Sequence, residues 1–136
     1  MNVRSSKAKD VYYTSDHEWI DFQGSVAFAG ICRFKLTGFK QIQQLSWTGD
    51  PTGFKKRGEI VANLKYNEYV ITVHMPVEGK ILEINSKLLS GNLNLLLDCA
   101  ETTGWLFRLS PAQPHDRTGL LLPKQYQLNG KNKYAK

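Results

Sequence analysis

Short segments in which apolar and polar residues alternate recur along most of the chain, separated by Gly, Asn, Ser or Pro. Alternation with a period of two is typical of β-strands that bury one face. Many short strands with turn residues between them indicate an antiparallel sandwich or barrel rather than a helix bundle. The predicted strands are Glu18–Phe22, Ser25–Ile31, Ile42–Trp47, Glu59–Tyr66, Tyr69–Met75, Lys80–Asn85 and Trp105–Leu109. We therefore expect a mainly β fold.

Two stretches interrupt this alternation and predict small helices. Between residues 32 and 41, apolar side chains recur at roughly helical spacing, although Gly38 weakens the prediction. Near the end, Leu120–Leu128 contains Pro123, which suits the first turn of a short helix that begins there. We expect each helix to be one to three turns long.

The apolar pattern from Glu59 to Met75 predicts a β-hairpin and its register. If Asn67 and Glu68 form a two-residue turn, every apolar residue on one face meets another apolar residue. The predicted pairs are Tyr66 with Tyr69, Leu64 with Ile71, Ala62 with Val73, and Ile60 with Met75. A slip of one residue would set one apolar row against the opposite face.

The predicted tip of this hairpin is Asn67-Glu68. Asn suits the first turn position because it tolerates a positive φ better than most residues. Glu68 suits the second position less well than Gly would. Lys65 lies beside this tip rather than on it.

The net charge of +6 resides in the ends of the chain. Residues 1–10 hold three basic side chains and one acidic, and residues 124–136 hold four lysines and no acid, whereas residues 11–123 hold eleven of each sign. We expect a single domain over residues 11–127, flanked by basic tails at 1–10 and 128–136 that are solvated. A neutral body argues against nucleic acid as a partner. Its one basic cluster, residues 55–57 (Lys-Lys-Arg), favours a solvated loop, with a docking patch for an acidic partner as the alternative.

Nothing in the sequence predicts a membrane segment. The chain has no apolar run near the roughly eighteen residues that a membrane helix needs, and residues 1–10 are polar with no apolar signal region. We expect a cytoplasmic protein. Cys32 and Cys99 are far apart and in no metal-binding spacing, so both are expected to be reduced thiols without a chemical role.

The histidines form no catalytic or metal-binding motif in the sequence. His17 and Glu18 begin like the H-E-x-x-H zinc motif, but Asp21 stands where the second histidine is required. His74 and His115 are not arranged with an acid and a nucleophile, and we expect both at the surface. We therefore predict no catalytic residues and no metal site.

An ordered set of motifs resembles one known family from about residue 13 to 127. The matching segments are Tyr13-Thr14-Ser15-Asp16-His17-Glu18-Trp19, Gly30-Ile31, Pro76-Val77-Glu78-Gly79, Ile81–Asn85, Gly104-Trp105-Leu106-Phe107 and Leu120–Tyr126. They are similar, in order and with nearly unchanged spacing, to the segments Y-T-x-x-H-E-W, G-I, P-V-S-G, V-x-x-V-N, G-W-L-F and L-L-x-x-x-x-Y of the glycine cleavage system H protein.

This resemblance implies the lipoyl-domain architecture, a hybrid of two antiparallel sheets with small helices. In that family a lysine at a hairpin tip is joined through an amide to lipoic acid. The arm then moves between glycine decarboxylase, the aminomethyltransferase and dihydrolipoamide dehydrogenase. The resemblance therefore implies a carrier or interaction protein of glycine catabolism rather than an enzyme with its own active site.

The attachment lysine itself is missing from its family position. That lysine follows the glycine that opens the strand by ten residues and precedes the proline after the hairpin by eight. Counting from Gly58 and from Pro76 gives position 68 both times, and Glu68 stands there. We expect a degenerate carrier, unmodified and without a cofactor, that acts through protein contacts. Its partners are the three enzymes, the lipoate-attaching enzymes or an unrelated protein, and the sequence does not choose among them. The alternative is a working carrier that is lipoylated at Lys65.

Overall fold

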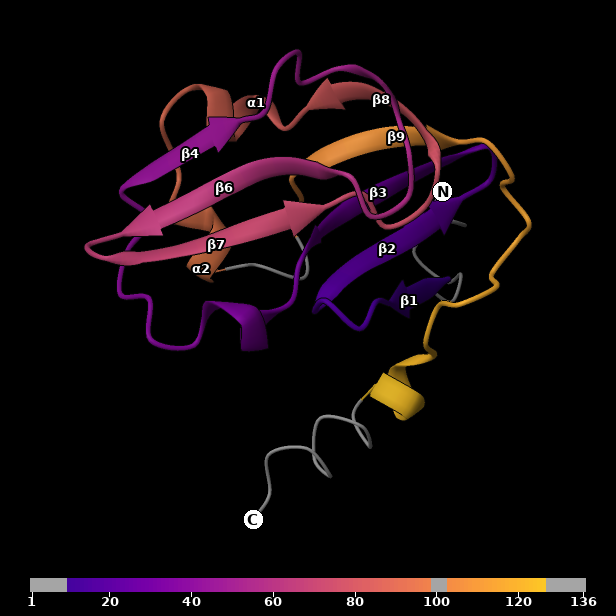
Figure 1. Ribbon diagram of the computed structural model, residues 1–136, viewed down its shortest axis with the longest axis horizontal. Helices are drawn as coiled ribbons and strands as arrows, with labels where there is room; N and C mark the ends of the chain where they lie inside the picture. The colour runs from indigo at the N-terminus through magenta and orange to yellow at the C-terminus, as the bar shows by residue number, and fades with distance from the viewer. Residues whose placement is uncertain (1–9, 99–102, 127–136) are drawn as a thin grey trace, which may run out of the picture.

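The computed structural model describes residues 10–98 and 103–126. Two antiparallel sheets form the fold, one with strand order β1-β2-β3-β9-β8-β5 and one with order β4-β6-β7 (Figure 1). The strands are β1 (Val11–Tyr13), β2 (Glu18–Gln23), β3 (Val26–Ile31), β4 (Gln44–Trp47), β5 (Gly53–Lys55), β6 (Ile60–Tyr66), β7 (Tyr69–His74), β8 (Gly79–Ile84) and β9 (Phe107–Pro111). The predicted mainly β class is confirmed, as a sandwich; in the described residues the sheets do not close into a barrel.

The two sheets share one hydrophobic core. The large sheet contributes buried side chains such as Ile20, Ile31 and Phe107, and the small sheet contributes Leu64 and Val73. Buried and partly exposed residues alternate along β9, as expected for a strand with one face toward the core. Burial of these apolar faces is the main force that holds the sheets together.

All seven predicted strands are present, with ends within two residues of the prediction. β4 and β9 each begin two residues later than predicted. At β4, the Ile42 N–H donates to Asn94 Oδ1 at 3.1 Å rather than to a neighbouring strand. The sequence did not reveal β1 and β5, each three residues long. So short a run gives too little alternation to recognise.

Both predicted helical segments are present, and the first is about one turn long, within the predicted range. Residues 32–41 hold one 3₁₀ helix, η2 (Arg33–Leu36), which ends just before Gly38 at φ 94°. The helical turn 123–126 begins at Pro123 as expected. Two further helices, α1 (Ser86–Leu89) and α2 (Leu95–Asp98), were not predicted. None of the helices in residues 10–98 and 103–126 is long and apolar enough to cross a membrane.

The hairpin register is confirmed at three of the four predicted pairs: Tyr66 with Tyr69, Leu64 with Ile71, and Ala62 with Val73. The fourth is wrong, because a bulge between Ile60 and Ala62 pairs Ile60 with His74 instead of Met75. The extra residue, Val61, turns into the core and is 1% exposed, whereas Ile60 is 43% exposed.

Some predictions fall on residues whose structure is not described. Cys32 is buried, whereas Cys99 lies outside the described ranges. The predicted tails, apart from residue 10, and residues 127 and 128 of the predicted last helix also lie outside them. The division into one domain and two tails stays a prediction.

Candidate functional site

The β6–β7 hairpin ends in the predicted two-residue turn (Figure 1). Asn67 adopts a φ of 55°, the left-handed conformation that such a turn requires of its first central residue. Glu68 is the second turn residue and is exposed. The side chain at position 68 therefore extends from the apex of the small sheet into solvent.

Contacts from the segment before β4 hold the shape of this tip. The Gln43 side-chain amide makes two hydrogen bonds with Asn67. Its Nε2 donates to Asn67 Oδ1 at 3.2 Å, and its Oε1 accepts from the Asn67 backbone N–H at 2.7 Å. The ring of Phe39 lies 5.8 Å from Tyr66 and 6.2 Å from Tyr69, measured between centroids. Gln43 supports the turn through hydrogen bonds, and Phe39 supports it through ring contacts with Tyr66 and Tyr69.

Lys65 lies in strand β6 and not at the apex. Its Cα partners are Val70 on β7 and Gln44 on β4, so β6 is the central strand of the small sheet at this point. The Lys65 carbonyl also accepts from the Gln43 N–H at 2.9 Å. The backbone of Lys65 is held on both sides, while its side chain is exposed.

A buried ionic network lies at the other end of β7, and sequence reasoning missed it. Glu18 is 2% exposed and accepts from Lys35 Nζ at 2.8 Å and from the His74 backbone N–H at 2.8 Å. Its Oε2 also lies 3.0 Å from His74 Nδ1, and Thr14 Oγ1 donates to Oε1 at 3.4 Å. The predicted surface position of His74 is wrong, because this side chain is 22% exposed and bound to Glu18. His115 is exposed, as predicted.

The same network contains the one group of potential metal ligands within the described ranges, formed by Asp16, Glu18 and His74. Their ligand atoms lie within 4.8 Å of one another. However, the Lys35 ammonium already contacts Glu18 Oε2 at 2.8 Å and neutralises its charge. A cation bound there would have to displace this ammonium, so the geometry favours an ion-pair network over a metal centre.

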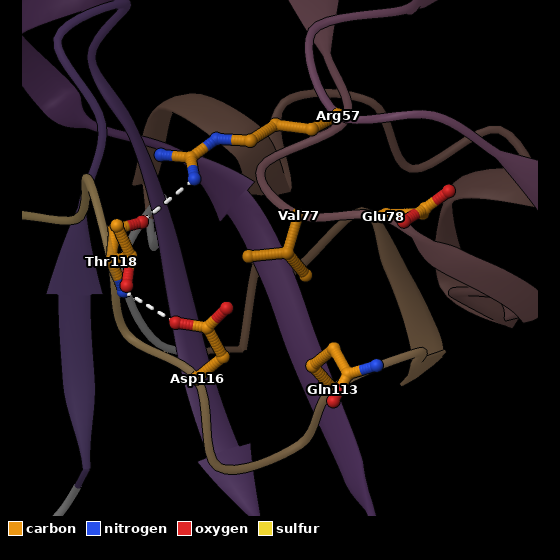
Figure 2. Close-up of a pocket in the computed structure, with 6 residues that line it drawn as sticks. All are labelled: Arg57, Val77, Glu78, Gln113, Asp116 and Thr118. Carbon is orange, nitrogen blue, oxygen red and sulfur yellow. Dashed lines mark hydrogen bonds between the residues drawn. The ribbon is translucent and has the colours of Figure 1, made fainter.

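A shallow pocket of about 190 Å³ lies beside the loop before β6 (Figure 2). Arg57 Nη1 donates to the Thr118 carbonyl at 2.7 Å, and Asp116 accepts from the Thr118 N–H at 2.9 Å. Hydrogen bonds from Thr118, the side chain first, hold the pKa of Asp116 below its usual value. The side chains of Arg57, Glu78 and Asp116 are exposed to solvent. The charged side chains that line this pocket are thus solvated, and the lowered pKa of Asp116 follows from its hydrogen bonds with Thr118.

The basic cluster at residues 55–57 divides among three environments. Lys55 belongs to β5 and its Nζ donates to the Asp50 carbonyl at 2.8 Å, and Arg57 bonds the Thr118 carbonyl. Lys56 and Arg57 are exposed, consistent with the predicted solvated loop.

Comparison with known proteins identifies the family. The family described as glycine cleavage H-protein matches residues 11–133. A probable glycine cleavage system H protein of Aeropyrum pernix is 32% identical over 124 residues, which cover 91% of this chain and 85% of the relative. The glycine cleavage system H protein of Thermotoga maritima is 30% identical over 117 residues, 85% of this chain and 91% of the relative.

The fold agrees with these sequence relationships. The crystal structure of a glycine cleavage system H protein from Mycobacterium marinum superposes with a TM-score of 0.72, at 22% identity, over 91% of this chain and 99% of that one. The chain belongs to the glycine cleavage H-protein family.

Proposed function

We propose that this chain is a glycine cleavage H-protein homologue that carries no lipoyl group and acts through protein contacts. The observation that carries the proposal is the exposed Glu68 at the apex of the β6–β7 turn. By resemblance to the family, this apex is where the attachment lysine stands. The chain thus combines the carrier's fold with a tip that has no amine.

The chemistry of attachment supports this reading of the tip. Lipoate is attached when its activated carboxyl group is transferred to a primary amine, forming an amide. A carboxylate offers no such amine, and joining two carboxyl groups would give a labile anhydride. Glu68 is therefore unable to hold the arm.

The alternative carrier site, Lys65, has an exposed side chain, which favours it as a second candidate. Its backbone, however, is fixed between β4 and β7. Moving the turn by three residues to bring Lys65 to the apex would place Leu64 in the turn, and burying such a side chain is worth about 1.5–3 kcal/mol. Ladder and core contacts thus oppose a carrier role for Lys65.

The partners that we propose are those of the family: glycine decarboxylase, the aminomethyltransferase, dihydrolipoamide dehydrogenase or the lipoate-attaching enzymes. A chain that lacks the lipoyl group but retains the carrier surface would bind one of these enzymes without taking part in aminomethyl or electron transfer. We infer no active site of its own, because no convergent set of nucleophile, base and acid is found in the described residues.

Intact-mass measurement tests the proposal directly. The wild-type chain is produced in lipoate-fed cells together with a lipoate ligase, and we expect no lipoyl increment. The matched variants are Lys65→Arg, which removes the alternative amine, and Glu68→Lys with Lys65→Glu, which restores the family arrangement. We expect the double variant to gain the lipoyl group, because position 68 is exposed and its substitution leaves the fold intact.

Each outcome has a defined meaning. A lipoyl increment on the wild-type chain that is absent from Lys65→Arg would establish the Lys65 carrier and end the proposal. If the ligase lipoylates neither the wild-type chain nor the double variant, the tip departs from the family in more than one side chain. The absence of lipoate then follows from the backbone shape of the tip as well as from the missing amine.

A further inference from the structure

The outer edge of β7 has no strand beside it in the residues that the structure describes, since the small sheet has the order β4-β6-β7. Antiparallel strands direct their N–H and C=O groups alternately toward each neighbour. The Lys65 carbonyl faces β4, where it accepts from the Gln43 N–H, so Lys65 and its partner Val70 form a non-hydrogen-bonded pair. The pairs on either side, Tyr66 with Tyr69 and Leu64 with Ile71, are then the hydrogen-bonded ones. The backbone groups of Val70 and Thr72 therefore point outward, away from β6.

Glu18 closes this edge at its far end. The His74 N–H also points outward, and it donates to the Glu18 carboxylate at 2.8 Å. A partner strand cannot take that position while the carboxylate occupies it. The open edge is thus confined to the half of β7 next to the tip.

Exposed apolar side chains accompany the open edge. Tyr69 is 61% exposed and Val70 is 58% exposed, and they project to opposite faces of the sheet. An unpaired edge with large apolar side chains is a template for pairing with another strand. Between Tyr69 and Thr72 this edge carries neither a proline nor a charged residue that would block such pairing.

We propose that this edge pairs with the same edge of a second copy of the chain, with the two β7 strands antiparallel and Val70 opposite Val70. A two-fold axis then passes through this pair and joins the two three-stranded sheets into one of six strands. In this register Tyr69 of each copy lies opposite Ile71 of the other, so apolar residues meet on both faces.

The position of Glu18 selects this register over its neighbours. Outward groups pair with outward groups, so the other candidates place Thr72 opposite either Val70 or Thr72. The first sets Glu68, and the second Val70, against His74 of the other copy, where the Glu18 carboxylate already lies. With Val70 opposite Val70, the chain turns away at Asn67 and Glu68 before it reaches that point.

The register also gives the Glu68 side chain a partner. Glu68 of one copy lies opposite Thr72 of the other. Thr72 Oγ1 lies 3.4 Å from His74 Nε2 within the chain, so its hydroxyl donates to the Glu68 carboxylate only by turning away from that ring. Residues 68–72 of each copy make a small interface, below the roughly 1,200 Å² of stable complexes. We therefore expect a weak dimer, with a dissociation constant between about 1 µM and 1 mM.

Sedimentation velocity of the full chain over a range of concentrations tests the proposal. The wild-type protein is expected to shift from monomer to dimer as its concentration rises. Val70→Glu should abolish the dimer, because the two carboxylates would lie opposite each other, while Lys65 across the hairpin compensates the charge within the monomer. Leu89→Glu, at another exposed apolar residue, is the matched control and should dimerise like the wild type.

A charge-pairing experiment tests the register itself. Val70→Lys alone should also be monomeric, but an equimolar mixture with Val70→Glu should recover a heterodimer because opposite charges then meet. Recovery is expected only if residue 70 faces residue 70. Far-UV circular dichroism verifies that each variant is folded.

Three results would overturn the proposal, and none depends on whether a lysine is lipoylated. If the wild-type chain stays monomeric up to about 1 mM, the proposal is refuted. The edge then pairs with a strand from a different protein or stays exposed to solvent. A dimer that persists in Val70→Glu would lie on another surface. Loss of the dimer in both variants without recovery on mixing would refute the register.

Discussion

Replacing Glu18 with alanine tests how the base of the hairpin is anchored. The substitution removes the carboxylate that accepts from Lys35 Nζ and the His74 N–H, and it leaves both groups without this acceptor in a largely buried position. Removing one member of a buried ion pair costs about 3–5 kcal/mol, because the remaining charge is uncompensated. Lys35 keeps 12% side-chain exposure, so some water reaches it and we expect about 3 kcal/mol, the lower end.

Urea unfolding measures this loss as a shift in midpoint at constant slope. Against a total stability of about 5–15 kcal/mol for a domain, about 3 kcal/mol is a large fraction. Asp16→Ala is the matched control, since its carboxylate is 55% exposed and 3.8 Å from His74 Nδ1, and we expect a change below about 1 kcal/mol.

The double variant Glu18→Gln with Lys35→Met separates charge from packing. It removes both charges while keeping an amide oxygen for the His74 N–H, and we expect a smaller loss than from Glu18→Ala. A loss below about 1 kcal/mol in Glu18→Ala would refute the reasoning, because it would mean that the network is solvated rather than buried. A double variant as unstable as Glu18→Ala would show that packing, and not the unpaired charge, dominates.

Three further outcomes are expected in urea unfolding. Val61→Ala should cost about 1–3 kcal/mol and Ile60→Ala much less, because the bulge buries Val61 and exposes Ile60; equal losses would argue against the bulge. Gly79→Ala should destabilise by about 1–3 kcal/mol, since its Cβ would lie 2.5 Å from the Ser110 carbonyl oxygen, and a neutral result would contradict that close approach. The folded-state pKa of Asp116 is lowered, so its stabilising effect should be present above its ordinary value of 3.8 and lost as pH falls through the lower folded value. Asp116→Asn should remove this pH dependence, and an unchanged profile would argue against the Thr118 hydrogen bonds.

The hairpin was predictable because its information is local. Apolar residues on both sides of Asn67-Glu68 match in a single register, and the turn residue tolerates positive φ. The bulge was not predictable, since Ile60 and Val61 are both apolar and either can face the core. Only the structure shows which of the two faces the core. The Met75 N–H donates to the Glu59 carbonyl, and the ladder is shifted by one residue between Ile60 and Ala62.

The Glu18 network was out of reach of sequence reasoning for a different reason. Its partners Lys35 and His74 lie 17 and 56 residues further along the chain, in η2 and β7, and no periodicity links positions in separate elements. A glutamate that opens a predicted strand is most often solvated. The pocket beside Arg57 was not predicted for the same reason, because its lining comes from the loop before β6 and from residues near position 118 that are distant in sequence.

Under the proposed function, the residues that shape the hairpin tip are separate from the side chain that decides attachment. The tip conformation depends on Asn67, on the Gln43 amide that binds it, and on the ladder behind it. In the described part of the chain, the Glu68 side chain has no hydrogen bond or ion pair that supports the turn. The apex can therefore accept a different exposed side chain at little cost in stability. Under the proposed function, the family fold sets the scaffold, and the side chain at position 68 sets whether the scaffold can carry an acyl arm.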